Sequence, residues 1–448
     1  MHKELSISDT AAILTMIWSH TKQRGVAIGI LSAIAYFCFL SVAPISFLEK
    51  PCGDCNSLPD NVIAGKGWVD DSGNFADARP PGHPLIIIGL KQLADVVSVP
   101  EADMFILFNV FLLSFSAVLL YLIAIEVWRT NAVMLVPVAW VTCPFVVWFL
   151  NQPYSEVPFF VLFFASILTF FRSLKADAGK LFWYGLLTGA LLGAAMMIRS
   201  IGIALPVIMG ISWLALSRPW PKRVHSLYLI ALFLGSVMLV LPWSLIMYKE
   251  TNEIRFLGPP TLAENSIANG LKFVTNIDGD REKLAVSLDV ANYAEHLYAD
   301  IFVNEKTRVD SGQLLGQVSG LIKGVLDNPV PGISFYFLKL HRAWYGTYSH
   351  RLEFWTLLIQ VGYFVLLSLS ILIIYQNRLR PKYVFVLTTL VVLYFWTLAL
   401  LFEPLVRYMV APMGLLFLFF PAINWKGRGR LYSFQNCLQK ERQSRVKG

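Results

Sequence analysis

Charged side chains at the ends of apolar stretches are the residues of this sequence best placed to do chemistry. Glu156 begins an apolar run within Asn-Gln-Pro-Tyr-Ser-Glu-Val-Pro, and no other acid lies within 20 residues of it on either side. Arg199 separates two further runs, and Glu403 and Arg407 lie between the last two. Arginine binds phosphate through paired hydrogen bonds, and a carboxylate can accept a proton from an attacking hydroxyl. These residue types favour a substrate that carries a phosphate group.

A second set of candidates lies between the first two apolar runs. Asp54 stands within Cys-Gly-Asp-Cys, and Asp60 follows six residues later. Arg79 and His83 belong to Ala-Arg-Pro-Pro-Gly-His-Pro. Asp54 is a candidate base, although several other acids share its loop. The two cysteines beside it favour a local disulfide over a zinc site, because no second pair of ligands is near.

Structural roles are open for several of these residues. Arg199 could extend its guanidinium to lipid headgroups while its stem stays in the apolar layer. Arg407 could pair with Glu403 at the i, i+4 spacing of a helix, although Pro404 disturbs a regular helix there.

The elements that must position these residues are membrane-spanning helices. Of the 448 residues, 56% are hydrophobic and only 15% are charged, against roughly 25% charged in an ordinary soluble domain. This composition excludes a soluble enzyme, a disordered chain and a small disulfide scaffold. Because a span needs about 20 apolar residues, we expect an all-α polytopic membrane protein. Its ten charge-free runs are Gly25–Phe47, Met104–Ile125, Ala132–Leu150, Val157–Phe171, Leu181–Ile198, Ser200–Ser217, Ser226–Tyr248, Phe354–Gln376, Tyr383–Phe402 and Met409–Trp425.

The distribution of Lys and Arg predicts that both termini are cytoplasmic. In that threading every short inner loop is rich in basic residues, as the positive-inside rule requires. The net charge of +8 is then a signal of topology and of affinity for anionic membrane lipids. It does not indicate nucleic-acid binding.

The chain divides into segments on the two sides of the membrane. The segment His83–Val99 is apolar but short and interrupted by charges, which predicts a helix lying in the interface. Within the long outer insertion, Lys283–Val325 has helical periodicity, Asn328-Pro-Val-Pro-Gly332 breaks it, and Ile333–Trp344 predicts a second interfacial helix. The expected division is a cytoplasmic N-terminus at 1–24, a membrane core at 25–248 with an outer loop at 48–103, an outer helical insertion at 249–353, C-terminal spans at 354–425 and a basic cytoplasmic tail at 426–448.

Short motifs in a fixed order complete the sequence evidence. They are the early Asp54, Gly65-Lys-Gly-Trp68, Arg79-Pro-Pro-Gly-His-Pro-Leu85, Tyr154-Ser-Glu-Val-Pro-Phe-Phe160, Ile198-Arg-Ser-Ile-Gly202 and Glu403-Pro-Leu-Val-Arg-Tyr408. Their order and sidedness resemble the GT-C superfamily of membrane glycosyltransferases. The nearest resemblance is to the dolichyl-phosphate-mannose–protein mannosyltransferase-like and lipid A aminoarabinose transferase-like families, over about residues 25–425.

The resemblance implies transfer of a sugar, with inversion, from a polyprenyl-phosphate-linked donor to a glycolipid, glycan or protein acceptor. It implies an integral protein of a bacterial inner membrane, with the active site facing outside the cytoplasm. Asp54 would be the general base, with Asp60 as its rival, and Glu156 would orient the acceptor. Asp54 and Glu156 would also be the ligands of a divalent cation if one takes part. The residues expected at the donor phosphate are Arg79, His83, Arg199 and Arg407, with Glu403 and Tyr408 completing the late motif.

Two other functions compete with this interpretation. A secondary transporter would use Glu156 and the arginines as substrate or proton sites, but transporters place such groups near the middle of the bilayer. An outer-face ligase or polymerase of surface polysaccharide would also use a long outer loop with Arg and His.

Overall fold

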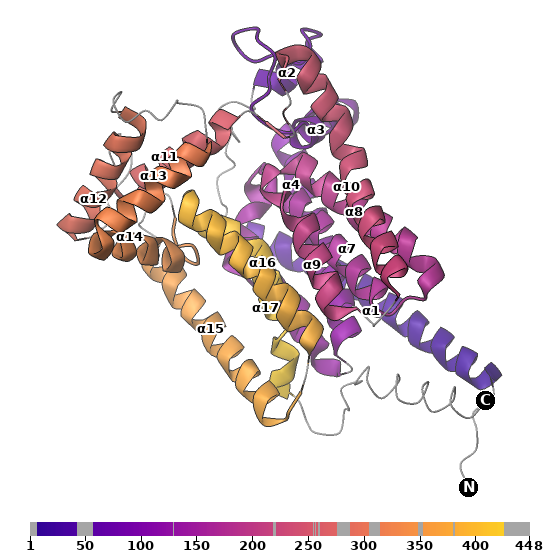
Figure 1. Cartoon of the computed structure of the whole chain (residues 1–448). Helices are drawn as coiled ribbons and strands as arrows, with labels where there is room; N and C mark the ends of the chain where they lie inside the picture. Colours follow the sequence, from indigo (N-terminus) through magenta and orange to yellow (C-terminus); the bar gives the residue numbers. More distant parts are fainter. Residues whose placement is uncertain are drawn as a thin grey trace.

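The computed structural model describes residues 7–42, 57–128, 130–217, 221–253, 255, 257–258, 260–275, 287–303, 314–347, 353–379 and 381–424. Every regular element within these ranges is helical, and a single bridge pairs Val69 with Phe75 (Figure 1). The predicted helical fold class is confirmed at this level.

Eight helices in the described ranges are long and apolar enough to cross a membrane. This finding indicates a polytopic integral membrane protein. The eight are contained in α1 (Ile7–Val42), α4 (Glu101–Val127), α7 (Glu156–Ser173), α8 (Ala178–Ile198), α10 (Lys222–Thr251), α15 (Glu353–Gln376), α16 (Lys382–Leu401) and α17 (Val406–Phe417) with η6 (Phe420–Asn424).

Two of the ten expected spans differ from simple helices. The third is a bent pair, Asn131–Val141 and Pro144–Asn151, whose halves meet at 50°. Pro144 explains the break, because proline lacks the backbone N–H that a continuing helix needs. The sixth is short, with η4 (Ser200–Gly202) followed by α9 (Leu205–Leu216). The number of ten spans and the cytoplasmic position of both termini therefore stay predictions.

The helices α8 and α10 pack closely against each other. Gly185, Gly189 and Gly193 recur every four residues on α8. A Cβ atom on Gly189 would overlap the carbonyl oxygen of Leu232 on α10. Glycine is therefore required for the two backbones to lie this close, as in other tightly packed membrane helices.

Polar contacts join the C-terminal end of α4 to the C-terminal ends of α7 and α17. Glu126, near the end of α4, pairs with Arg172 at 3.3 Å and with Lys175 at 2.7 Å. The indole nitrogen of Trp128 donates to the carbonyl oxygen of Leu418 at 2.6 Å. These are ends that the sequence assigns to the cytoplasmic side.

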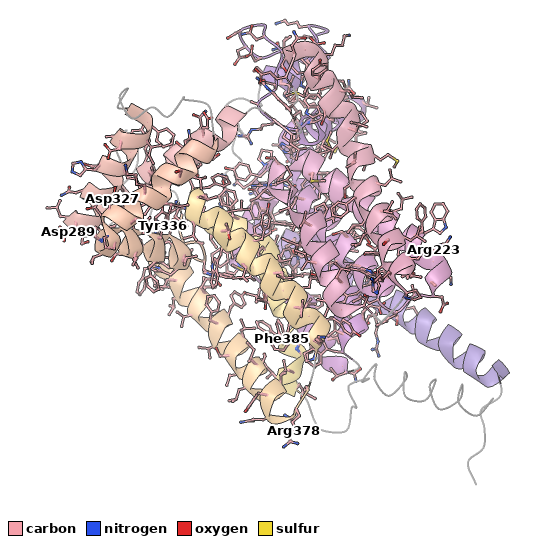
Figure 2. The ribbon with its side chains drawn as sticks, viewed as in Figure 1. Arg223, Asp289, Asp327, Tyr336, Arg378 and Phe385 are labelled. Atoms are coloured by element: carbon pink, nitrogen blue, oxygen red, sulfur yellow. The ribbon has the colours of Figure 1, made fainter. Side chains whose placement is uncertain are left out.

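The insertion that the sequence predicts to lie on the outer side forms a helical subdomain beside the bundle (Figure 1), and it is called the outer subdomain after that prediction. Its helices are α11 (Pro260–Thr275), α12 (Leu288–Tyr298), η5 (Ala299–Val303), α13 (Leu314–Asp327) and α14 (Pro329–Arg342). They enclose a separate apolar core made of Ile267, Leu271, Val290, Tyr293, Ala294, Leu297, Leu321 and Phe335. Figure 2 shows Asp289 and Asp327 at the edge of this subdomain, far from Arg378 at the other end of α15.

The last helix of the subdomain begins earlier than the sequence predicted. We expected Asn328-Pro-Val-Pro-Gly332 to break the helical pattern and the next helix to start at Ile333, but α14 starts at Pro329. Proline is tolerated in the first turn of a helix, where its missing N–H would have no partner in any case. Only Asn328 separates α13 from α14.

Candidate active site

Glu156 is the first residue of α7 and lies at the end of the bundle opposite Glu126. Glu156 is only 4% exposed. The segment before it is held by the buried Asn109 of α4, whose side-chain nitrogen donates to the carbonyl oxygens of Phe149 at 3.1 Å and Gln152 at 2.9 Å. A carboxylate in the first turn also gains from the positive end of the helix dipole.

Two arginines converge on one oxygen of this carboxylate. Arg199, which ends α8, pairs through Nη1 with Oε1 of Glu156, and the same nitrogen lies 3.4 Å from Oγ of Ser155. Nε of Arg407, in the first turn of α17, lies 3.9 Å from the same Oε1. The three ionised groups carry one net positive charge, so the cluster is suited to an anion that competes with Glu156 for the guanidiniums.

Two tyrosines frame the guanidiniums. The Arg407 guanidinium carbon lies 4.9 Å from the ring centre of Tyr408 and 5.9 Å from that of Tyr154. Arg199 lies 5.6 Å from the same Tyr408 ring. Nη2 of Arg407 also donates to the Tyr408 hydroxyl at 2.9 Å. Cation–π contacts of this kind restrict the guanidinium planes and stabilise their charge.

His83 joins the cluster from α3 (Gly82–Val97), the helix expected in the interface. Burial lowers the pKa of His83 to about 4, and Glu156 opposes this shift while Arg79 and Arg199 add to it. The imidazole also hydrogen-bonds the backbone of Pro153. With a pKa of about 4, the imidazole of His83 is neutral at pH 7.

Close packing fixes the start of α3 against the end of α8. A Cβ atom on Gly82 would lie 2.5 Å from the carbonyl oxygen of Met197, two residues before Arg199. Gly82 thus lets the segments that carry His83 and Arg199 approach each other. Arg79 lies three residues before this contact and is exposed.

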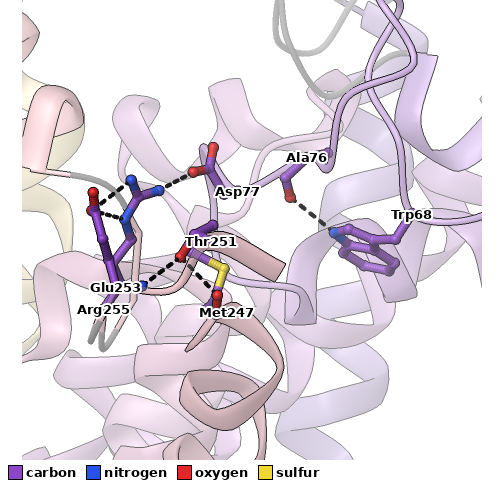
Figure 3. A network of polar contacts seen from close by, with 7 residues as sticks. All are labelled: Trp68, Ala76, Asp77, Met247, Thr251, Glu253 and Arg255. Carbon is purple, nitrogen blue, oxygen red and sulfur yellow. Dashed lines mark hydrogen bonds and ion pairs between the residues drawn. The ribbon is translucent and has the colours of Figure 1, made fainter. Parts of the chain in front are cut away.

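The loop that precedes Arg79 is anchored on the end of α10 (Figure 3). The rings of Trp68 and Trp243 meet edge to face with centroids 5.5 Å apart, and the Trp68 indole donates to the carbonyl oxygen of Ala76 at 3.0 Å. Asp77 pairs with Arg255, just beyond α10. These contacts hold the chain that leads into α3.

The structure places Asp60 away from the cluster. Asp60 lies in α2 (Ser57–Ile63), and its carboxylate pairs with Lys91 at 2.8 Å. Lys91 is eight residues beyond His83 on α3, which is about 12 Å along a helix axis. Asp54 and the cysteines of its motif lie outside the described residues.

Glu403 and Arg407 are separated by the end of one helix and the start of the next. The chain is not helical from Phe402 to Leu405, as Pro404 predicted. Arg407 approaches Glu156, whereas buried Glu403 acts electrostatically on Lys339 of the outer subdomain. The i, i+4 geometry of a continuous helix is therefore absent.

Sequence reasoning did not single out three residues that lie around the site. Tyr154 and Ser155 stood within the quoted motif, so their contacts with the arginines could have been anticipated. Asn109 was detectable as an amide inside an apolar run.

Among the described residues, no group of three or more His, Cys, Asp or Glu side chains is placed to hold a metal ion, and Asp54, one of the two expected ligands, lies outside those residues. The fold and the site together define a polytopic helical membrane protein with a buried Glu–Arg cluster at one end of its bundle. No protein-family model matches the chain, and a search of curated proteins found no match.

Proposed function

We propose that this protein is a membrane glycosyltransferase that moves a sugar from a polyprenyl-phosphate-linked donor to an acceptor outside the cytoplasm. The observation that supports this best is the convergence of Arg199 and Arg407 on Glu156. This cluster lies at the end of the bundle opposite the basic loops. A phosphate anchored in the outer leaflet could reach it from the lipid, whereas a cytosolic nucleotide sugar could not.

The chemistry requires little more than charge placement. The acceptor oxygen bonds to the anomeric carbon from one face while the bond from that carbon to the phosphate oxygen breaks on the other. A carboxylate accepts the acceptor proton, and Arg199 and Arg407 stabilise the charge of the departing polyprenyl phosphate. Before the donor binds, Glu156 keeps the guanidiniums aligned, which reduces the reorganisation needed in the transition state. Neutral His83 has one ring N–H, which donates to the carbonyl oxygen of Pro153, so its other ring nitrogen is suited to accepting a hydrogen bond from a sugar hydroxyl.

The assay that tests this proposal compares two donors with the purified full-length protein. We expect sugar transfer from a polyprenyl-phosphate sugar and none from a nucleotide sugar. Arg407→Gln should lower turnover by at least about 10²-fold, as loss of one transition-state donor does. Arg172→Gln, which removes an arginine at the opposite end, is the matched control. Robust transfer from a nucleotide sugar alone would contradict the proposal.

The identity of the base needs its own comparison. Asp54→Asn is expected to lower kcat by about 10²- to 10⁴-fold, the usual cost of losing a general base. Asp60→Asn should have less than about a tenfold effect, because Asp60 is exposed and paired with Lys91. A dead Asp60→Asn beside a normal Asp54→Asn would move the base to Asp60.

A transporter remains the second candidate, and the bent third span favours it. Broken helices often line the substrate sites of transporters, and this one ends at Asn151, close before Glu156. Solute or proton flux in proteoliposomes, without sugar transfer, would support the transporter instead.

A further inference from the structure

The outer subdomain contains a cavity of about 440 Å³. Its lining residues come from α12, from η5 and from the corner where α13 meets α14, so it shares no residue with the Glu–Arg cluster. Cavities that bind small molecules usually measure about 300–1,000 Å³. This cavity is therefore large enough for a ligand of its own.

The polar groups of the cavity are suited to hydroxyl groups and not to anions. Its lining includes the carboxylates of Asp289, Asp300 and Asp327 and the amides of Asn292 and Asn328, whereas no Lys or Arg is among the described residues that line it. Carboxylates accept hydrogen bonds, and amides both donate and accept them. A sugar can satisfy both kinds of group, whereas a phosphate would meet three carboxylates without a counter-charge.

A buried hydroxyl at the cavity wall supplies independent evidence for a ligand. Tyr293 lines the cavity and is 6% exposed, and its hydroxyl has no hydrogen-bond partner among the described residues. The ring packs against Phe335 in the apolar core, with centroids 5.8 Å apart. A Cβ atom on Gly324, another residue of the cavity lining, would lie 3.4 Å from the Tyr293 hydroxyl. The hydroxyl therefore extends from the core to the cavity wall, where a ligand would supply the missing partner.

An apolar stripe borders the same cavity. Val330, Ile333 and Phe337 of α14 are 76%, 63% and 66% exposed, and their spacing of three and four residues places them on one face of the helix. Leu326, near the end of α13, is 74% exposed as well. Val330 also lines the cavity, so one edge of the cavity is part of this apolar stripe.

The position of the apolar stripe indicates that membrane lipid covers it. Arg342, the last residue of α14, pairs with Glu353, the first residue of α15. The helix α15 is long and apolar enough to cross a membrane, and its exposed Phe354 and Trp355 continue the apolar surface (Figure 1). Because α14 is held at the start of a span, its apolar face is placed where amphipathic helices contact the boundary between headgroups and acyl chains.

We propose that the cavity binds the uncharged sugar headgroup of a glycolipid whose acyl chains lie in the membrane against the apolar stripe. The role of this glycolipid as the acceptor rests on the proposed glycosyltransferase function, whereas its binding does not. The protein then selects two lipids by opposite charge. The guanidiniums of the Glu–Arg cluster favour a lipid phosphate, and the carboxylates of the cavity exclude one.

The first experiment tests the lipid contact without any ligand. Nitroxide labels are attached to single cysteines at positions 330, 333 and 337 in a full-length variant without native cysteines, and the protein is reconstituted in phosphatidylcholine. Glu295, an exposed residue of α12 outside the cavity lining, provides the control position. We expect the three labels to be more accessible to oxygen, which enters lipid, than to a water-soluble nickel chelate, and the control label to show the reverse. Labels on α14 that behave like the control would overturn the proposal.

The second experiment measures headgroup selection in nanodiscs that contain glucosyl or galactosyl diacylglycerol, or phosphatidylglycerol. We expect phosphatidylglycerol to bind at least about tenfold more weakly than the better glycosyl lipid. Asn292→Trp, which fills the cavity, should weaken binding of that glycosyl lipid by at least about tenfold. Glu295→Trp should leave the binding unchanged, and equal melting temperatures of the two variants would show that both are folded.

Three results of this experiment would overturn the proposal. They are the absence of glycosyl-lipid binding, a preference for phosphatidylglycerol, and equal weakening by the two tryptophan variants. Methyl glucoside and methyl galactoside are tested as competitors. If either binds as tightly as the corresponding lipid, the cavity is a site for soluble sugars and the lipid part of the proposal fails.

Transfer kinetics separate this inference from the proposed function. Binding of a glycosyl lipid without any sugar transfer would defeat the glycosyltransferase and leave the headgroup site standing. If transfer occurs, Asn292→Trp should raise the KM for the glycolipid acceptor by about tenfold and leave the KM for the polyprenyl-phosphate sugar unchanged. An unchanged KM for the acceptor would overturn its assignment to this cavity.

Discussion

Glu156 shares one buried carboxylate oxygen between two guanidiniums, and this makes its removal informative. Glu156→Gln should lower the melting temperature, because loss of one partner of a buried ion pair typically costs about 3–5 kcal/mol. An anion at the site would replace the missing charge. Polyprenyl phosphate is therefore expected to raise the melting temperature of Glu156→Gln by more than that of the wild type.

Glu126→Gln is the matched control for that experiment. Glu126 also pairs with two cations, Arg172 and Lys175, but at the opposite end of the bundle. Its variant should be destabilised without selective rescue by the lipid phosphate. Equal rescue of both variants would mean that the lipid acts on the bundle as a whole.

The pKa of His83 predicts how the stability of the protein depends on pH. Its pKa is about 4 in the folded protein and about 6.5 in an unfolded chain. The unfolded state binds the proton first, so the stabilisation is complete above pH 6.5 and is lost as the pH falls through 4. The difference between the two pKa values corresponds to roughly 3 kcal/mol of unfolding free energy.

The measurement is thermal unfolding at about pH 7 and about pH 4.5. His83→Gln should lose less stability on acidification than the wild type does. His296→Gln, on the exposed face of α12, should behave like the wild type. If His83→Gln and the wild type lose the same stability, the imidazole is not buried in its neutral form.

At the residue scale, the sequence identified charges but not contacts. Glu156, Arg199 and Arg407 were detectable because ionisable groups are rare beside apolar runs. Their convergence on one carboxylate depends on how three helices pack, and spacing along the chain does not encode that. Asp60 illustrates the converse case, because its pairing with Lys91 gave no sequence signal.

At the scale of elements, Gly189 on α8 controls the approach of α8 to α10. Gly189→Ala places a methyl group against the Leu232 carbonyl and should force the helices apart, at a cost of about 1–3 kcal/mol. Gly179→Ala, near the start of the same helix, meets no atom within 4 Å and should be neutral. Melting temperatures of the two variants provide the check. Equal values would show that the helices can separate without cost.

Membrane spans can be predicted from hydropathy, whereas the breaks within and between helices depend on individual residues such as proline. A run of about 20 apolar residues indicates a membrane helix whatever its neighbours are. The bend before Pro144 was readable in principle, since proline ends helices. The start of α14 was misplaced because Pro329 and Pro331 initiate a helix as readily as they break one.

At the scale of the whole molecule, the orientation can be tested by labelling. We expect a cysteine at position 289 to react with an impermeant maleimide in intact cells, and one at position 378 to react only after permeabilisation. The reason is the asymmetry of Lys and Arg. Both cysteines belong in a variant without the native ones. The opposite pattern would put the Glu–Arg cluster on the cytoplasmic side.

The coupling of the insertion to the bundle was beyond sequence reasoning. Gly270 and Phe402 are more than a hundred residues apart in the chain, yet they pack together. Helical periodicity predicted that the insertion would be helical. It could not predict which face would meet the turn between α16 and α17, because such contacts depend on shape complementarity.

The unequal lengths of α7 and α10 set the depth of Glu156. With 18 residues, α7 is about 27 Å long, whereas the 30 residues of α10 extend about 45 Å. A helix of 27 Å barely crosses a hydrocarbon layer of about 30 Å, so we expect Glu156 at the border of the acyl chains. The thickness of the bilayer should therefore affect how well the two guanidiniums reach a lipid phosphate. We expect a thicker membrane to move the plane of the lipid phosphates away from the two guanidiniums, and a thinner one to expose them to water.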